Sequence, residues 1–370
     1  MRRVVIKLGS SIVADEFGEL REDTLARVCD AVSALHRDGQ EAIIVTSGAI
    51  ARGMHVMNLK QRPSSIGELQ AASAVGQGKL YRVYDELLRE RGLTSAQVLL
   101  TFFDMSARTH YLNVRETLTQ LLNWRVVPVI NENDTTATDE ISFGDNDFLA
   151  AQVAILAGAE ELVLLTDIDG LYSSDPRLRT DAELIEEVED FAALEQLEIG
   201  HTTSPLGSGG MRSKVVAADM ATAAGIATTI CNGLTPGALE RVLTGARAGT
   251  RFPAREARYS SFKLWLKYAK PPRGTIVVDG GAARAMRDAS ASLLPVGVIE
   301  VQGEFDAGDA VLIAVRDETQ PAGAGLIGKG ICSYSAAELR QVMRKQSAAV
   351  RELLPRATEE AVHRDYLVLD

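Results

Sequence analysis

The chain has 370 residues, of which 46% are hydrophobic and 24% charged, and its net charge at pH 7 is −11. That length is too great for one compact core and predicts two or more domains. The acidic balance disfavours nonspecific binding to nucleic acid or to an anionic membrane surface. No apolar run approaches the roughly 18 residues needed to span a bilayer.

The three cysteines, Cys29, Cys231 and Cys332, are odd in number and far apart, which disfavours a disulfide framework. Such cysteine usage is typical of a protein of the reducing cytoplasm. The five histidines show no metal-ligand spacing, so no structural zinc site is expected. At the N-terminus Lys7 interrupts the apolar stretch, and we interpret this stretch as a first strand and not as a targeting segment.

Short β-branched runs alternate with longer amphipathic stretches through the first two thirds of the chain. The runs predict strands at residues 4–8, 42–46, 97–100, 126–130, 161–166 and 227–230. The stretches between them predict helices at 24–36, 67–89, 114–122, 148–156 and 211–224. This alternation favours an α/β fold with an open, mostly parallel sheet sandwiched by helices.

The composition changes near residue 250. Residues 251–273 hold seven basic residues against the single acid Glu256 and end in two prolines and a basic residue, which is typical of a boundary. Short β-like runs at 275–278, 298–301 and 310–314 and a helical stretch at 336–345 follow. The sequence therefore predicts a first domain at 1–255, a linker at 256–273, a small β-rich domain at 274–350 and a tail at 351–370.

Ligands bind parallel sheets beyond the carboxyl ends of the strands, so the residues that follow each strand are candidates for a site. Lys7 precedes a turn at Gly9 after the first strand, and Ser47 begins a turn after the second. Both turns could hold an anion on backbone amides. Each, taken alone, is also consistent with a solvated lysine or with an N-cap serine.

The most unusual stretch follows the fourth strand, where Asn-Glu-Asn-Asp at 131–134 is joined by Gly-Asp-Asn-Asp at 144–147. Capping one helix does not require seven amide and carboxylate side chains. A carboxylate accepts from an ammonium group and an asparagine amide donates to a carboxylate, so the set suits a zwitterion.

Two further turns suit a nucleotide. Thr166 and Asp167 end the fifth strand and could bond a ribose or an adenine edge, although an ordinary Asp-Gly turn is the alternative. The glycines of residues 207–210 precede a helix whose first turn holds Lys214, which suits phosphate, with a mobile linker as the alternative. Neither the Walker A spacing nor the dinucleotide fingerprint is found.

The ordered series KLGSS, VTSGAI, VPVINENDT, FGDNDFLA, LLTDIDGLY and GSGGMRSK resembles the amino acid kinase family, over essentially the whole chain. Within that family it is similar to the members that phosphorylate glutamate. The C-terminal portion, from VVDGGAARA to GLIGKGICSYSA, resembles a PUA domain, a small β-rich pseudo-barrel. The resemblance implies ATP- and Mg²⁺-dependent conversion of L-glutamate into γ-glutamyl phosphate, the first step of proline biosynthesis.

The same resemblance implies roles for individual residues. Lys7, Asp147 and Lys214 would be catalytic, with Asp147 holding the two lysines, and Ser47, Asp134 and Asn146 would bind glutamate. The ATP contacts would be Lys7, Thr166, Asp167, Ser208, Gly209, Gly210, Met211, Arg212, Ser213 and Lys214. No protein metal site is implied, since Mg²⁺ would be bound mainly through the ATP phosphates. Proline would be a feedback inhibitor, the chain would form a homo-oligomer, and a glutamyl-phosphate reductase would be a partner.

Two alternatives stay open at this point. A kinase of the same fold could act on another amino acid or on a nucleotide monophosphate, but the latter would call for basic residues where residues 131–134 and 144–147 offer amides and carboxylates. A protein of another class could bind RNA through the PUA-like portion. From Pro271 onward 11 lysines and arginines stand against 14 acidic residues, which disfavours strong phosphate contacts.

Overall fold

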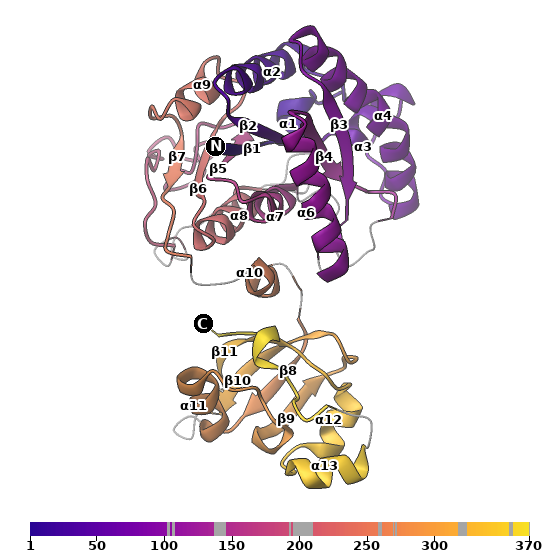
Figure 1. Cartoon of the computed structure of the whole chain (residues 1–370). Coiled ribbons are helices and arrows are strands. Elements are labelled where there is room, and N and C mark those ends of the chain that lie inside the picture. The colour runs from indigo at the N-terminus through magenta and orange to yellow at the C-terminus, as the bar shows by residue number, and fades with distance from the viewer. Residues whose placement is uncertain are drawn as a thin grey trace. The chain divides into compact units, whose positions relative to one another are not determined.

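The computed structural model describes residues 1–101, 104–105, 108–136, 146–191, 194, 210–257, 261–268, 270, 272–316, 324–354 and 358–369. The chain divides into two compact units, Met1–Arg258 and Tyr259–Asp370, which Figure 1 shows in indigo to orange and in brown to yellow. None of the described helices combines the length and the apolar character needed to cross a bilayer.

The first unit is built on a seven-stranded sheet in the order β3-β4-β2-β1-β5-β6-β7. Its strands are β1 (Arg3–Leu8), β2 (Glu41–Val45), β3 (Ser95–Leu100), β4 (Val127–Glu132), β5 (Glu161–Thr166), β6 (Ala227–Asn232) and β7 (Thr250–Phe252). All neighbouring strands are parallel except β6 and β7. The carboxyl ends of the six parallel strands therefore share one edge of the sheet.

Helices cover both faces of this sheet. They are α1 (Ser10–Val13), α2 (Glu22–Arg37), α3 (Ala49–Val56), α4 (Ile66–Glu90), α6 (Arg108–Asn123), α7 (Asn146–Ala157), α8 (Met211–Ala223) and α9 (Ala238–Leu243). Figure 1 shows α2 and α9 on one side of the strands and α7 and α8 on the other. Ile6 and Leu8 join the core beneath α2, so Lys7 between them points to the opposite face, where α7 lies.

The helix pair α3 and α4 is held at close range by glycines. A Cβ atom at Gly76 would overlap the carbonyl oxygen of Ala49, and one at Gly53 would overlap that of Ala72. The turn before α3 also requires a glycine, because Gly48 has a φ of +99°. These contacts fix α4 relative to Ser47, which follows β2.

The second unit is built on a five-stranded sheet in the order β12-β11-β10-β8-β9, in which only β8 and β10 are parallel. Its elements are α10 (Ser261–Tyr268), β8 (Pro272–Val278), α11 (Gly280–Ala289), η2 (Pro295–Gly297), β9 (Val298–Gly303), β10 (Ala310–Arg316), β11 (Ala324–Ile331), α12 (Ala336–Val342), α13 (Ser347–Leu353), η3 (Arg364–Tyr366) and β12 (Leu367–Leu369). It has a hydrophobic core of its own, which includes Ile276, Val311 and Leu339.

The predicted fold class is confirmed, since a mostly parallel sheet sandwiched by helices is followed by a small β-rich unit. All six strands and all five helices predicted for the first unit are present within about two residues of their expected bounds, except that α6 begins six residues before the predicted start at 114. The predicted domain boundaries stay a prediction. Within the predicted linker the structure has α10, and within the predicted tail it has β12, which pairs with β11.

The close approach of α3 and α4 gives a test with a matched control on the same helix. We expect Gly76→Ala to lower the free energy of unfolding by about 1–3 kcal/mol, because the new methyl group must displace backbone. Gly78→Ala, where no atom lies within 4 Å of the added Cβ, should instead raise it by about 0.5–1 kcal/mol. Urea titrations followed by circular dichroism measure both, and equal effects of the two changes would contradict the packing described above.

Candidate active site

Side chains that lie far apart in the sequence meet at the carboxyl edge of the first sheet. Lys7 lies near the end of β1, Ser47 follows β2 and Asp134 follows β4. Asn146 and Asp147 begin α7, and Lys214 lies in the first turn of α8. Each of these six side chains is at least nine-tenths buried. The catalytic and glutamate-binding residues predicted from the sequence therefore gather in one region.

The centre of this region is a carboxylate between two ammonium groups. Asp147 Oδ1 lies 2.5 Å from Lys7 Nζ, and Asp147 Oδ2 lies 3.1 Å from Lys214 Nζ. The hydroxyl of Ser213 donates to Asp147 Oδ2 at 2.8 Å. Asp147 has no exposed surface, and Lys7 and Lys214 are 3% and 6% exposed, so one buried negative charge faces two buried positive charges.

The helix starts explain this arrangement in part. Asp147 lies in the first turn of α7, where the helix dipole favours a carboxylate. Burial alone would raise the pKa of Asp147, but the ammonium groups of Lys214 and Lys7, with hydrogen bonds from Lys7 and Ser213, hold it well below its usual range. The carboxylate is therefore ionised throughout the neutral range and pairs with both ammonium groups.

A second cluster, of amides and hydroxyls, adjoins the first. Asn146 Nδ2 lies 2.9 Å from each of three acceptors, namely Thr46 O, Ser47 Oγ and Asn131 Oδ1. Asn146 Oδ1 is buried and finds no hydrogen-bond partner in the described part of the chain. The sequence predicted that asparagine would donate to a carboxylate of the ligand. In the structure the Asn146 donor is engaged within the protein, and its acceptor is the atom left for a ligand.

Asp134 is the third charged group of the region. Its Oδ2 accepts a hydrogen bond of 2.5 Å from the Ser73 hydroxyl. Burial raises the pKa of Asp134, and the hydrogen bond from Ser73 and the positive charge of Arg62 offset that rise only in part. A cation placed beside Asp134 would therefore stabilise its ionised form.

Helix α4 contributes polar groups that the sequence analysis did not identify. Ser73, Gln77 and Tyr84 hydrogen-bond to Asp134, Asn131 and Thr46, respectively. The three are spaced four and seven residues apart, which places them on one face of a helix. Polar residues on the inward face of the amphipathic pattern at 67–89 were the signal that could have revealed them.

The residues predicted to bind a nucleotide lie on the β5 and α8 side of the region. Thr166 ends β5 and its hydroxyl lies 3.4 Å from Asp167 Oδ1, while Asp167 forms a 3.3 Å ion pair with Arg177. Gly210 precedes α8 without a side-chain cap, and Met211, Arg212, Ser213 and Lys214 form the first turn. The predicted contacts Ser208 and Gly209 lie outside the described residues.

Among the residues that the structure describes, no group of three or more His, Cys, Asp or Glu side chains could hold a metal ion. The Asp147 carboxylate, which is the most buried of the site, has both oxygens bonded to ammonium and hydroxyl groups.

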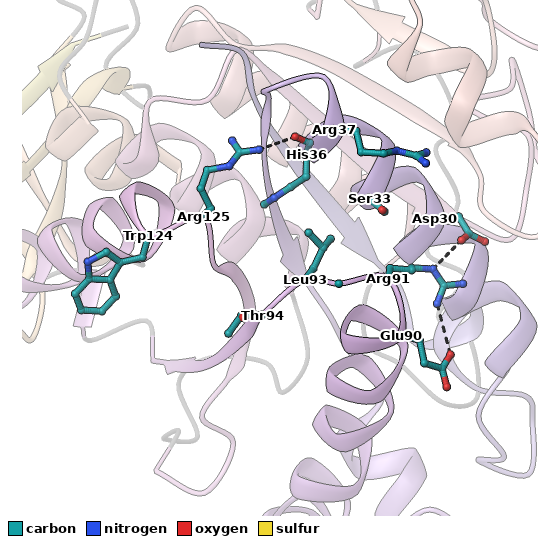
Figure 2. Close-up of a pocket in the computed structure, with 11 residues that line it drawn as sticks. Asp30, Ser33, His36, Arg37, Glu90, Arg91, Leu93, Thr94, Trp124 and Arg125 are labelled. Atoms are coloured by element: carbon teal, nitrogen blue, oxygen red, sulfur yellow. Dashed lines mark hydrogen bonds and ion pairs between the residues drawn. The ribbon is translucent and has the colours of Figure 1, made fainter.

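A hollow of about 720 Å³ lies elsewhere on the first unit (Figure 2). Its lining comes from the ends of α2 and α4 and from the turns before β3 and β4, and consists of Asp30, Ser33, His36, Arg37, Glu90, Arg91, Gly92, Leu93, Thr94, Trp124 and Arg125. Figure 2 shows Arg91 paired with Asp30 and Glu90, and Arg125 donating to His36 O. These turns are at the amino ends of the strands, so the hollow is separate from the cluster around Asp147.

Comparison with known proteins adds to this geometry. The model of the amino acid kinase family matches residues 2–232, and that of the PUA domain matches residues 274–354. The glutamate 5-kinase of Meiothermus ruber is 44% identical over 369 residues, which cover 100% of this chain and 96% of that protein. The corresponding enzyme of Methylibium petroleiphilum is 45% identical over 371 residues and that of Thermus thermophilus 43% over 369, covering 100% of this chain and 98% and 97% of those proteins.

The charge cluster gives a prediction on stability. Asp147→Asn should lower the free energy of unfolding at pH 7 by about 3–5 kcal/mol, because it removes the charge of the carboxylate that pairs with two buried ammonium groups. Since the pKa of Asp147 is lower in the folded than in the unfolded state, its contribution is complete at neutral pH. That contribution is lost as the pH falls below about 4, so the difference between variant and wild type should shrink there.

Denaturant titrations between pH 7 and pH 3 measure this difference. Asp30→Asn is the control, because its ion pair with Arg91 involves a carboxylate that is 63% exposed and should change stability by about 1 kcal/mol or less. A pH-independent difference for Asp147→Asn would show that the carboxylate charge is not what stabilises the cluster.

Proposed function

The chain belongs to the amino acid kinase family, and from that membership we propose that it transfers the γ-phosphoryl group of ATP to the side-chain carboxylate of L-glutamate. The observation that carries the proposal is the buried cluster of Lys7, Asp147 and Lys214 at the carboxyl edge of the sheet, where one carboxylate holds two ammonium groups in place. Phosphoryl transfer depends on charge compensation and in-line positioning, with little covalent chemistry for the protein to perform. The product is γ-glutamyl phosphate, formed in the first step of proline biosynthesis.

The acceptor needs no general base. The side-chain carboxyl group of glutamate has a pKa of about 4.3 and is ionised at neutral pH. We assign the α-ammonium group to the Asp134 carboxylate and to Asn146 Oδ1, both of which belong to buried side chains. The Ser47 hydroxyl accepts from Asn146, so its own proton is available for a carboxylate of the substrate. These groups recognise an amino acid and do not suit a nucleotide monophosphate.

The two lysines stabilise the phosphoryl group while it is transferred. Lys7 approaches from β1 and Lys214 from α8, and Asp147 between them fixes both ammonium groups. Because the cluster is buried, each positive charge acts in a low dielectric and needs no reorganisation during the reaction. Asp147 thus acts through the lysines, and its own pKa keeps it from exchanging protons with the substrate.

The nucleotide occupies the β5 and α8 side. We assign its phosphates to residues 208–214 and Lys7, since the first amides of α8 have no side-chain cap and favour an anion. Thr166 and Asp167 at the end of β5 are assigned to the nucleoside. Mg²⁺ enters as part of the MgATP substrate, bound mainly through the phosphates, and compensates charge on the nucleotide.

Regulation and partners follow from the same assignment. Proline has the amino and α-carboxyl groups of glutamate, so it would compete at Asp134 and Asn146 as a feedback inhibitor. The acyl phosphate product is reactive toward water, which favours rapid consumption by a glutamyl-phosphate reductase.

We also propose a homo-oligomer, which light scattering would detect, and a cytoplasmic location, which fits three free cysteines that are all buried.

The reaction itself is tested by trapping the product. The purified chain is incubated with MgATP, hydroxylamine and, in turn, glutamate, aspartate, N-acetylglutamate and uridylate. Hydroxamate should form with glutamate, because hydroxylamine attacks an acyl phosphate, and free proline should suppress it. Hydroxamate from another acid would show that this acid, and not glutamate, is the substrate. Failure to form hydroxamate with any of the four compounds would refute the proposed reaction. Glutamate hydroxamate that proline leaves unchanged would refute only the regulation.

The role of the lysines is tested by their removal. Lys214→Ala and Lys7→Ala should each lower kcat by about 10²-fold or more, as for other preorganised donors to developing charge. Lys60→Ala removes an exposed lysine outside the cluster and serves as the control. Steady-state kinetics on variants with native circular dichroism measure the effect, and wild-type kcat in folded Lys214→Ala would exclude its role.

A further inference from the structure

Three amide side chains form a continuous series of hydrogen bonds from helix α4 to the amino end of α7. Asn131 Nδ2 donates to Gln77 Oε1 at 2.6 Å, and Asn146 Nδ2 lies 2.9 Å from Asn131 Oδ1. Asn131 and Asn146 are 2% and 3% exposed, and Gln77 is half-buried. Gln77, which we call the outer end of the series, is thus the only one of the three amides that solvent reaches to a sizeable extent.

The direction of each hydrogen bond in the series follows from the one before. The backbone amide of Glu132 donates to Asn131 Oδ1 at 2.9 Å, so this oxygen is fixed by the main chain. The Asn131 amino group must then point the other way, where Gln77 Oε1 accepts from it. Without that acceptor, the buried amino group of Asn131 would lose its hydrogen bond, and the series would have to rearrange.

The series determines which atom of Asn146 faces a ligand. Since Asn131 presents its oxygen, Asn146 must present its amino group to it, and Thr46 O and Ser47 Oγ accept on the same side. The Asn146 carbonyl oxygen is therefore turned away from all three acceptors. It is buried and has no partner within the described ranges, and an ammonium group is the donor that would satisfy it best.

Packing of α4 holds the outer end of the series in place. Gly76, which precedes Gln77, lies against the carbonyl oxygen of Ala49, in the first turn of the helix that follows Ser47. The adjacent side chain of Ser73 donates to Asp134 from the same helix. Gln77 Oε1 is thereby at a fixed place relative to the groups that would bind the amino acid.

We propose that Gln77 is a positioning residue for the amino acid substrate, which acts through Asn131 to keep Asn146 Oδ1 directed at the α-ammonium group. The proposal rests on the proposed function, since it names how the glutamate site selects for an amino group. Gln77 itself does not contact the substrate. Its effect is on the recognition of the ammonium group and not on the phosphoryl transfer at Lys7 and Lys214.

The test separates recognition of the amino group from general damage. Gln77→Met keeps the length of the side chain and removes the acceptor, and Gln77→Glu keeps an acceptor at the same atom. We expect Gln77→Met to raise the KM for glutamate about tenfold, with the KM for ATP unchanged and kcat altered by about threefold or less. Gln77→Glu should stay within about threefold of the wild-type KM for glutamate. Lys79→Met, an exposed position on the same helix, is the control.

Glutarate, which is glutamate without its amino group, provides a second readout. Its inhibition constant against glutamate should be the same in wild type and in Gln77→Met, because glutarate has no ammonium group whose recognition the change could weaken. The proposal would be overturned if Gln77→Met raised the inhibition constant of glutarate as much as the KM for glutamate, or if it raised the KM for ATP. An unchanged KM for glutamate in Gln77→Met, or equal defects in Gln77→Met and Gln77→Glu, would also overturn it. Failure of the wild type to form glutamate hydroxamate would instead refute the reaction, so the two failures are distinguishable.

Discussion

A carboxylate with no exposed surface, bonded to two lysine ammonium groups, is the interaction on which the first unit depends. Its members come from β1, α7 and α8, so the three charges meet only after the parallel sheet has formed. Burying them costs desolvation energy that a surface cluster would not incur. That cost is offset by close geometry, by the Ser213 hydroxyl and by the start of α7, and the two ammonium groups are thereby held in place within the protein.

The start of α7 also explains why two binding regions adjoin so closely. Asn146 and Asp147 are consecutive, and neighbouring residues of a helix point in directions about 100° apart. Asn146 faces the ends of β2 and β4, and Asp147 faces β1 and α8. A single helix terminus therefore fixes the residues proposed to bind the amino acid relative to those proposed to bind the phosphoryl group, and a direct transfer between two bound substrates requires such an alignment.

The sequence predicted the sheet well because each parallel strand is a short apolar run that ends in polar residues. It also predicted the convergence of Lys7, Asp134, Asn146 and Lys214, since parallel strands bring their carboxyl ends to one edge. It could not predict Gln77, because a glutamine within an amphipathic helix is ordinary until the partner across the interface is known. Nor could it predict that Asn146 offers its oxygen and not its amino group, since that choice depends on hydrogen bonds from residues 15 and 99 positions away.

Two buried polar groups at the carboxyl edge differ in how well the protein itself satisfies them. The pKa of Asp134 is raised by burial, and Asn146 Oδ1 lacks a partner among the described residues. An ammonium group beside Asp134 would stabilise its ionised form, and an ammonium group beside Asn146 Oδ1 would satisfy the amide oxygen. Under the proposed function a dicarboxylate without an amino group would leave both groups as they are, so selectivity for an amino acid would come from satisfying buried groups that the protein alone satisfies only in part.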